Sequence, residues 1–95
     1  MEILYTDDNI EVCLEVCKEI SSGPFIHISV RKFTVSKYKC ILEVWNDLQD
    51  VLSDRGYSRV YAIPPTLHQE KFIKMFGFRN TSVFFDHKNV MVREL

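Results

Sequence analysis

The stretch that decides the fold reads KYKCILEVWNDLQDVLSDR and covers residues 37–55. Its large apolar residues recur at the i, i+3, i+4, i+7 spacing of a helix; they are Tyr38, Ile41, Leu42, Trp45, Leu48 and Leu52. Gly56 follows, at the place where a residue in the left-handed conformation often ends a helix. The pattern predicts a long amphipathic helix that packs across one face of a sheet.

Two runs on either side of this helix are typical of core strands. Residues 25–33 read FIHISVRKF, in which successive side chains alternate between an aliphatic face and a more polar one. Residues 58–63 read SRVYAI. Pro64 and Pro65 then end the second run, because proline has no N–H to donate to a strand ladder.

The N-terminal part predicts a short strand followed by a helix. Residues 2–6 alternate weakly, as in a strand, and residues 8–11 (DNIE) have the form of a helix capping box. Apolar residues then follow at helical spacing; they are Ile10, Cys13, Leu14 and Cys17. This helix is expected to end before residues 21–24 (SSGP).

The C-terminal part predicts a third helix and a hairpin. Residues 66–69 (TLHQ) form a second capping box, and the helix that it starts is expected to end at Gly77. Two strands, 82–85 and 90–92, are joined by a polar turn at residues 86–89. The chain is therefore expected to form an α/β domain of the α+β kind, with three helices and a C-terminal β-hairpin.

The composition describes one small domain, residues 1–95, and limits its partners. Twelve basic residues against 13 acidic ones leave a net charge of −1, which argues against a nucleic-acid partner. No apolar run is long enough to cross a membrane, and the N-terminus MEILYTDDN is acidic where a signal peptide is basic. We expect a cytoplasmic protein that is not secreted. Three cysteines without a CxxC pair predict neither a disulfide framework nor a metal site.

The segment KFIKMFGFR, residues 71–79, resembles the end of the last helix in the GNAT superfamily of acyl-CoA N-acyltransferases. The resemblance covers roughly residues 25–95 and implies a truncated GNAT-like mixed sheet. Residues 25–32 would be the central strand, and residues 57–64 the strand that splays away from it. It also implies that Gly77 takes the helix-ending conformation and that Phe78 plugs the core. The strands that the family has before its central strand would be reduced.

The residues that carry the family's chemistry are absent from this chain. Its phosphate-binding loop, Gln/Arg-x-x-Gly-x-Gly/Ala, falls on residues 35–41, and neither register offers a glycine to let the backbone approach phosphate. The tyrosine that reprotonates the departing thiolate is replaced by Ile73, and Thr66 stands where an asparagine is common. We therefore expect no cofactor. If the chain were active, acetyl-CoA would lie against Val30, Lys37, Lys39 and Cys40.

Three further features suggest contacts or chemistry. His27 is a weak candidate for a general base, since a histidine on a partly covered strand face explains it as well. Arg31 and Lys32 belong to a local basic cluster that could meet an acidic partner. Phe84 and Phe85 are adjacent and point to opposite faces of their strand, so one of them is a candidate protein contact.

These observations predict a degenerate, non-catalytic GNAT-like domain that acts through a protein partner or as a homo-oligomer. The resemblance extends to small phage-encoded members of the family, which suggests a virion or assembly component or an inhibitor, located in the host cytoplasm or the virion. Two alternatives stay open. One is an acetyl-CoA-dependent N-acetyltransferase acting on a protein or small amine, and the other is a small nucleic-acid binder that uses the basic cluster.

Overall fold

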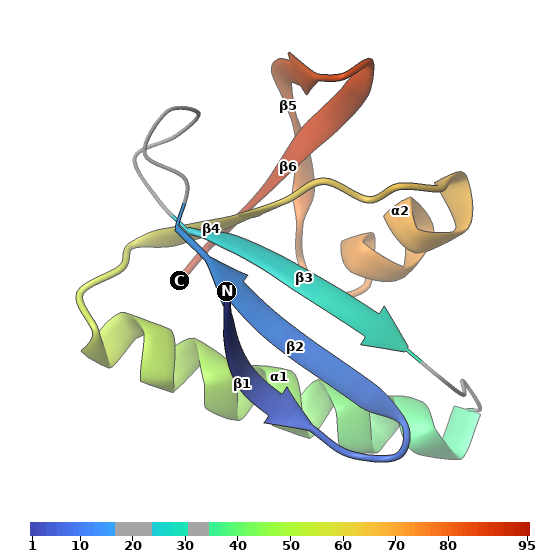
Figure 1. Cartoon of the computed structure of the whole chain (residues 1–95). Coiled ribbons are helices and arrows are strands. Elements are labelled where there is room, and N and C mark those ends of the chain that lie inside the picture. The colour runs from blue at the N-terminus through green and yellow to red at the C-terminus, as the bar shows by residue number, and fades with distance from the viewer. Residues whose placement is uncertain (17–23, 31–34) are drawn as a thin grey trace.

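The computed structural model describes residues 1–16, 24–30 and 35–95 of the chain. These residues form a mixed α+β fold of strands and helices in the order β1 (Glu2–Thr6), β2 (Ile10–Glu15), β3 (Phe25–Val30), α1 (Val35–Asp54), β4 (Arg59–Ala62), α2 (Leu67–Lys74), β5 (Arg79–Phe85) and β6 (Lys88–Glu94) (Figure 1). The described residues thus contain two helices rather than the three that the sequence predicted.

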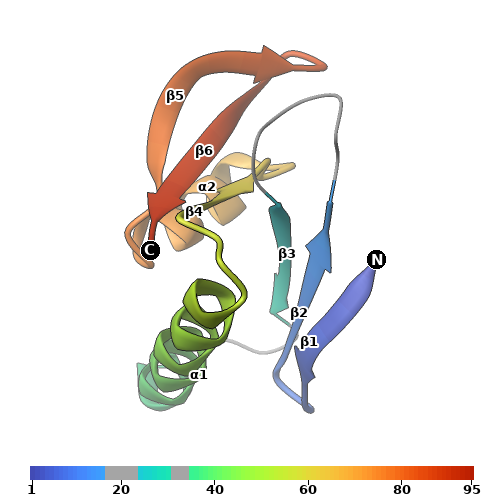
Figure 2. The same cartoon turned by 90° about the vertical axis from the view of Figure 1, so that its left-hand side faces the viewer.

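All six strands belong to one sheet with the order β1-β2-β3-β4-β6-β5. Strands β3 and β4 are parallel, with α1 as the connection between them, and all other neighbours are antiparallel. Hairpins therefore form both ends of the sheet, β1–β2 at one end and β5–β6 at the other. Figure 2 shows α1 against one face of β1–β3, while no described helix covers the opposite face of these three strands.

The long helix was predicted correctly, and α1 covers Val35–Asp54. Gly56 ends it with φ of +92°, a conformation that residues with a Cβ rarely adopt. The helix places Ile41, Trp45 and Leu52 in the core, as its apolar spacing requires. Strand β4 begins a few residues later and was also predicted.

The first predicted helix is wrong, because its segment forms β2. Ile10, Val12 and Leu14 alternate with polar or half-exposed neighbours, and all three are buried on the face toward α1. The expected capping box instead belongs to the β1–β2 turn, where the Asp7 carboxylate accepts hydrogen bonds from the backbone N–H groups of Asn9 and Ile10 at 2.7 and 2.9 Å. The strands before β3 are thus present as a hairpin. Cys17 and residues 18–23 lie outside the described residues.

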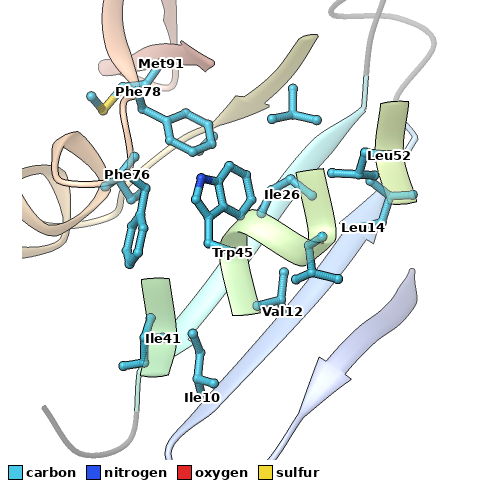
Figure 3. Close-up of a cluster of buried hydrophobic side chains, with 14 residues drawn as sticks. Ile10, Val12, Leu14, Ile26, Ile41, Trp45, Leu52, Phe76, Phe78 and Met91 are labelled. Carbon is cyan, nitrogen blue, oxygen red and sulfur yellow. The ribbon is translucent and has the colours of Figure 1, made fainter. Parts of the chain in front are cut away.

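An aromatic cluster fills the core between α1, α2 and the start of β5 (Figure 3). The ring centroids of Phe76 and Phe78 lie 6.2 and 5.5 Å from that of Trp45, and all three side chains are buried. Phe72 is half-buried and its ring centroid lies 4.8 Å from that of Phe76. Trp45, Phe76 and Phe78 are thus core residues, and Phe72 packs against them.

The second capping box and Gly77 were predicted correctly. Thr66 is the N-cap of α2, and its Oγ1 accepts a hydrogen bond from the Gln69 N–H at 3.2 Å. Gly77 has φ of +88°, and a Cβ built there would lie 2.6 Å from Nε of Arg93. Any other residue at this position would be strained and would displace the arginine, so glycine is required on two counts.

The C-terminal hairpin has longer strands and a shorter turn than expected. Its turn is only Asp86 and His87, with φ of 52° and 64°, which is the backbone pattern of a two-residue type I′ turn. Phe85 and Lys88 form the first Cα pair beside it. Aspartate and histidine adopt positive φ more often than most residues, so the turn forms without glycine.

Candidate functional site

The sheet opens between β3 and β4, its two central strands. Only one Cα pair, Phe25 with Tyr61, joins them, and the Tyr61 N–H donates to the carbonyl of Pro24 at 2.9 Å. Figure 1 shows the two strands diverging beyond this point, as β3 runs toward the start of α1 and β4 toward α2. The chain therefore has a splayed pair of parallel strands at the centre of its sheet.

A cleft of about 130 Å³ occupies the splay. Its walls come from β3, from the end of β4 and the residues after it, and from α2. The lining residues are Ile26, His27, Ile28, Ser29, Ala62, Ile63, Pro64, Pro65, Gln69, Phe72 and Ile73. Apart from His27, the lining residues are apolar or carry uncharged polar groups. The cleft therefore offers no permanent charge to a ligand.

His27 lies in this cleft, but its surroundings do not form a catalytic dyad. Its Nε2 is 3.8 Å from a carboxylate oxygen of Glu15, and both side chains are almost half exposed. An exposed pair at this distance contributes little. The sequence analysis missed Glu15 as a partner because it placed that residue on a helix; the antiparallel β2–β3 register brings the two side chains together.

The positions that the resemblance assigns to acyl transfer hold structural residues. Ile73, in the place of the tyrosine, is 6% exposed and belongs to the core. Thr66, in the place of the asparagine, uses its hydroxyl to cap α2. Ile73 has no proton that it could give to a leaving group, and Thr66 is not among the residues that line the cleft.

The residues expected to hold a cofactor are divided between two places. Val30 pairs with Ile10 beside the β1–β2 turn, and the Lys37 ammonium donates to the Asn9 side-chain oxygen in the same turn at 2.6 Å. Lys39 and Cys40 are exposed on the first turns of α1. Lys37 thus ties the turn to the helix, a structural role that the sequence did not reveal.

The cysteines of the described residues form no metal or thiol site. Burial raises the pKa of the Cys13 thiol, which favours its unreactive neutral form at neutral pH. Among the described residues, no group of three or more His, Cys, Asp or Glu side chains could hold a metal ion.

An apolar surface at the tip of the C-terminal hairpin is the second candidate site. Val83, Phe84 and Phe85 are 51%, 66% and 48% exposed, and they lie on β5, the outermost strand of the sheet. The sequence predicted one of the two phenylalanines as a contact residue; both are exposed. Arg31 and Lys32, the other predicted contact residues, lie outside the described residues.

A bulge in β5 fixes this tip. Between Asn80 and Phe84, β5 has more residues than the opposite part of β6. The Thr81 hydroxyl donates to the Val90 carbonyl at 2.7 Å and accepts from the Val83 N–H at 3.1 Å. The Asn89 amide donates to the carbonyls of Thr81 and Val83 at 2.6 and 3.1 Å. Side chains thus replace the backbone pairs that the bulge interrupts.

Comparison with known proteins gave no match to any family model, to any curated protein or to any solved structure. Neither helix of the described residues has the length and apolar character that crossing a bilayer requires.

Proposed function

We propose that this chain is a truncated, non-catalytic GNAT-like domain that acts through protein–protein contacts. The observation that carries the proposal is the tip of the β5–β6 hairpin, defined by Val83, Phe84 and Phe85, which exposes apolar side chains on both faces of its strand. Neighbouring apolar side chains of this size on a small domain are typical of an interaction surface, and aromatic residues are enriched at the centres of such surfaces.

The central sheet supports the family part of the proposal. The resemblance implies a central strand and a following strand that splays from it, and β3 and β4 are parallel and meet at one Cα pair. Gly77 has the positive φ and Phe78 the burial that the resemblance implies.

The non-catalytic part rests on replaced residues. The start of α1 contains no glycine, Lys37 is bonded to the β1–β2 turn, and Ile73 is packed in the core. With these losses, the domain keeps a scaffold for contacts without the groups that bind pyrophosphate or donate a proton. By analogy with small phage-encoded members of the family, such a domain would serve as a virion component, an assembly factor or an inhibitor.

Calorimetric titration of the purified chain with acetyl-CoA tests the non-catalytic part. We expect no heat of binding beyond dilution, because residues 35–41 contain no glycine that would let the backbone approach the pyrophosphate. Binding in the micromolar range would overturn the proposal.

Site-specific photo-crosslinking tests the contact part. Phe84→p-benzoylphenylalanine places the probe at the tip, and Val51→p-benzoylphenylalanine places it on an exposed position of α1 as the matched control. After irradiation in the cells that produce the protein, we expect position 84 to give one discrete adduct and position 51 to give none. Equal labelling at both positions, or no adduct at either, would contradict a specific contact at the tip.

One observation favours a second candidate, an acetyl-CoA-dependent N-acetyltransferase. The cleft in the β3–β4 splay lies where the family resemblance places the acyl end of the cofactor, with His27 in its lining. This function predicts acetyl transfer to an amine that Lys39→Glu impairs. Absence of turnover across a panel of small amines and peptides would exclude it.

A further inference from the structure

The inner edge of β3 carries backbone groups without a strand partner. Because the Tyr61 N–H donates to the Pro24 carbonyl, that carbonyl points toward β4. Backbone groups alternate sides along a strand, so those of Ile26 and Ile28 also point toward β4, while those of Phe25, His27 and Ser29 pair with β2. The Cα pairing with β4 stops at Phe25, and the Ile28 N–H and C=O consequently face the cleft unpaired among the described residues.

The opposite wall explains why β4 does not close this edge. Strand β4 ends at Ala62, and the chain continues through Ile63 to Pro64 and Pro65, which also line the cleft. Proline has no N–H, so this segment cannot extend the parallel ladder along β3. The two prolines thus keep open an edge that would otherwise pair within the sheet.

The cleft suits one kind of occupant, a thin and uncharged one. Its lining includes no lysine or arginine, so it offers no cation to a phosphate group. Its volume of about 130 Å³ is well below the roughly 300–1,000 Å³ of ordinary small-molecule sites. A peptide in extended conformation is narrow, pairs with a strand edge through its own N–H and C=O groups, and leaves the cleft at both ends.

We propose that the β3–β4 splay binds an extended apolar segment of a partner protein, which pairs with Ile28 as an added strand and packs its side chains against Phe72 and Ile73. The Gln69 side chain also lines the cleft, and its Oε1 is buried without a hydrogen-bond partner among the described residues. Rotation of this side chain toward the cleft would let the oxygen accept an N–H of the added strand. This inference rests on the proposed protein-binding function and deepens it by stating how the partner is held.

The test begins with selection of linear ten-residue peptides from a display library against the immobilised full chain. The enriched peptides are then titrated into ¹⁵N-labelled protein. We expect the amide signals of Ile28 and of its neighbours across the cleft to shift, while those at the hairpin tip stay unchanged. Failure to enrich any peptide would overturn the inference.

N-methylation of the bound peptide, one residue at a time, tests strand pairing without altering the protein. Loss of a hydrogen bond facing β3 should weaken binding by about tenfold, and methylation at the residues between should have little effect. Uniform tolerance of N-methylation would overturn the inference, because a strand edge recognises alternate backbone groups.

A pair of protein variants gives an independent readout. Ile28→Pro removes the N–H that faces the cleft and leaves the backbone pairs of β2 with the neighbouring residues of β3 in place. Ile28→Val keeps the N–H and serves as the matched control. We expect the proline variant to lose peptide binding by about tenfold and the valine variant to keep it, with circular dichroism showing that both are folded. If the proline variant does not fold, the N-methylated peptides decide the question.

The possible failures are distinguishable. Peptides that shift only the signals of Val83, Phe84 and Phe85 would overturn this inference and leave the proposed function standing. Acetyl-CoA that binds in the cleft, with no peptide that binds there, would overturn both.

Discussion

The two hairpins at opposite ends of the sheet are held in different ways. In β1–β2, alternate side chains of β2 lie beneath α1, and the edges are tied to that helix. The Arg55 guanidinium donates two hydrogen bonds to the Glu2 carboxylate at 2.8 and 2.7 Å, and Lys37 bonds to Asn9 in the turn. In β5–β6, the buried residues lie on β6, and they are Val90, Met91 and Val92. The part nearer the turn is held by hydrogen bonds of the Thr81 and Asn89 side chains.

This difference separates a hairpin that is part of the core from one whose tip is exposed. Strand β1 has a bulge, and its Glu2 forms an ion pair with Arg55. Bulges and charged side chains are known means of protecting an edge strand from pairing with another chain. Strand β5 also has a bulge, yet its tip is apolar and exposed. The C-terminal hairpin is thus held by local hydrogen bonds and exposes its apolar tip, and three measurements test this contrast.

The largest expected effect is on the free energy of unfolding, when a valine is replaced by alanine in each hairpin in turn. Val12 on β2 is 2% exposed, whereas Val83 on β5 is half exposed. Val12→Ala should lower the free energy of unfolding by about 2 kcal/mol, from two lost methyl groups and the cavity that remains. Val83→Ala should change it by less than about 0.5 kcal/mol. Urea denaturation followed by tryptophan fluorescence measures both, and equal losses would show that the tip belongs to the core.

A smaller effect is expected from Thr81→Val, which removes the hydroxyl that bridges the bulge. One lost bond costs about 1 kcal/mol, and amide exchange should speed up at Val83 and its neighbours while β2 stays protected. Ser82→Ala, an exposed position within the same bulge, is the matched control. If exchange at Val83 does not change, the bulge is held by something other than the threonine.

The smallest effect concerns pH and the β1 edge. The hydrogen bond from Arg55 lowers the pKa of Glu2 below its ordinary value of 4.5. Because the pKa is lowered in the folded state, the carboxylate stabilises the fold at pH values above its ordinary pKa. This contribution is lost as the pH falls through the lowered pKa. Glu2→Gln should therefore slightly lower the melting temperature at neutral pH and leave it unchanged at strongly acidic pH.

The control for this titration is Glu43→Gln, at an exposed position of α1. This variant removes a carboxylate and leaves the hydrogen bonds between Arg55 and Glu2 in place. A pH-independent effect of Glu2→Gln would mean that the Arg55 contact does not depend on charge.

Much of the fold could be predicted from local signals, and β2 shows why part of it could not. The i, i+3, i+4, i+7 spacing and Gly56 specified α1, and Thr66 and Gly77 bounded α2. In β2, however, Ile10 and Leu14 fit both a helical stripe and an alternating strand. Cys13 and Cys17 made the helical spacing fit better than the alternation. The segment forms a strand because it pairs with β3.

The candidate site was predictable only in outline. The resemblance implied that residues 57–64 splay away from residues 25–32. The unpaired edge at Ile28 depends on the register between β3 and β4, which the sequence does not contain. The Lys37–Asn9 hydrogen bond and the Thr81–Val90 hydrogen bond of the bulge join residues that are brought together only by the tertiary fold. No sequence motif predicts either bond. Phe84 and Phe85 were found because adjacent aromatic residues cannot share one face of a strand.

The single pair between β3 and β4 also sets the order in which the chain can fold. Both terminal hairpins join residues close in sequence, so they can close within microseconds. Phe25 and Tyr61 are separated by roughly 35 residues, and their meeting carries the larger entropy of loop closure with only one backbone pair in return. The centre of the sheet should therefore assemble after its two ends, once α1 has docked and its side chains, rather than strand pairing, hold the halves together.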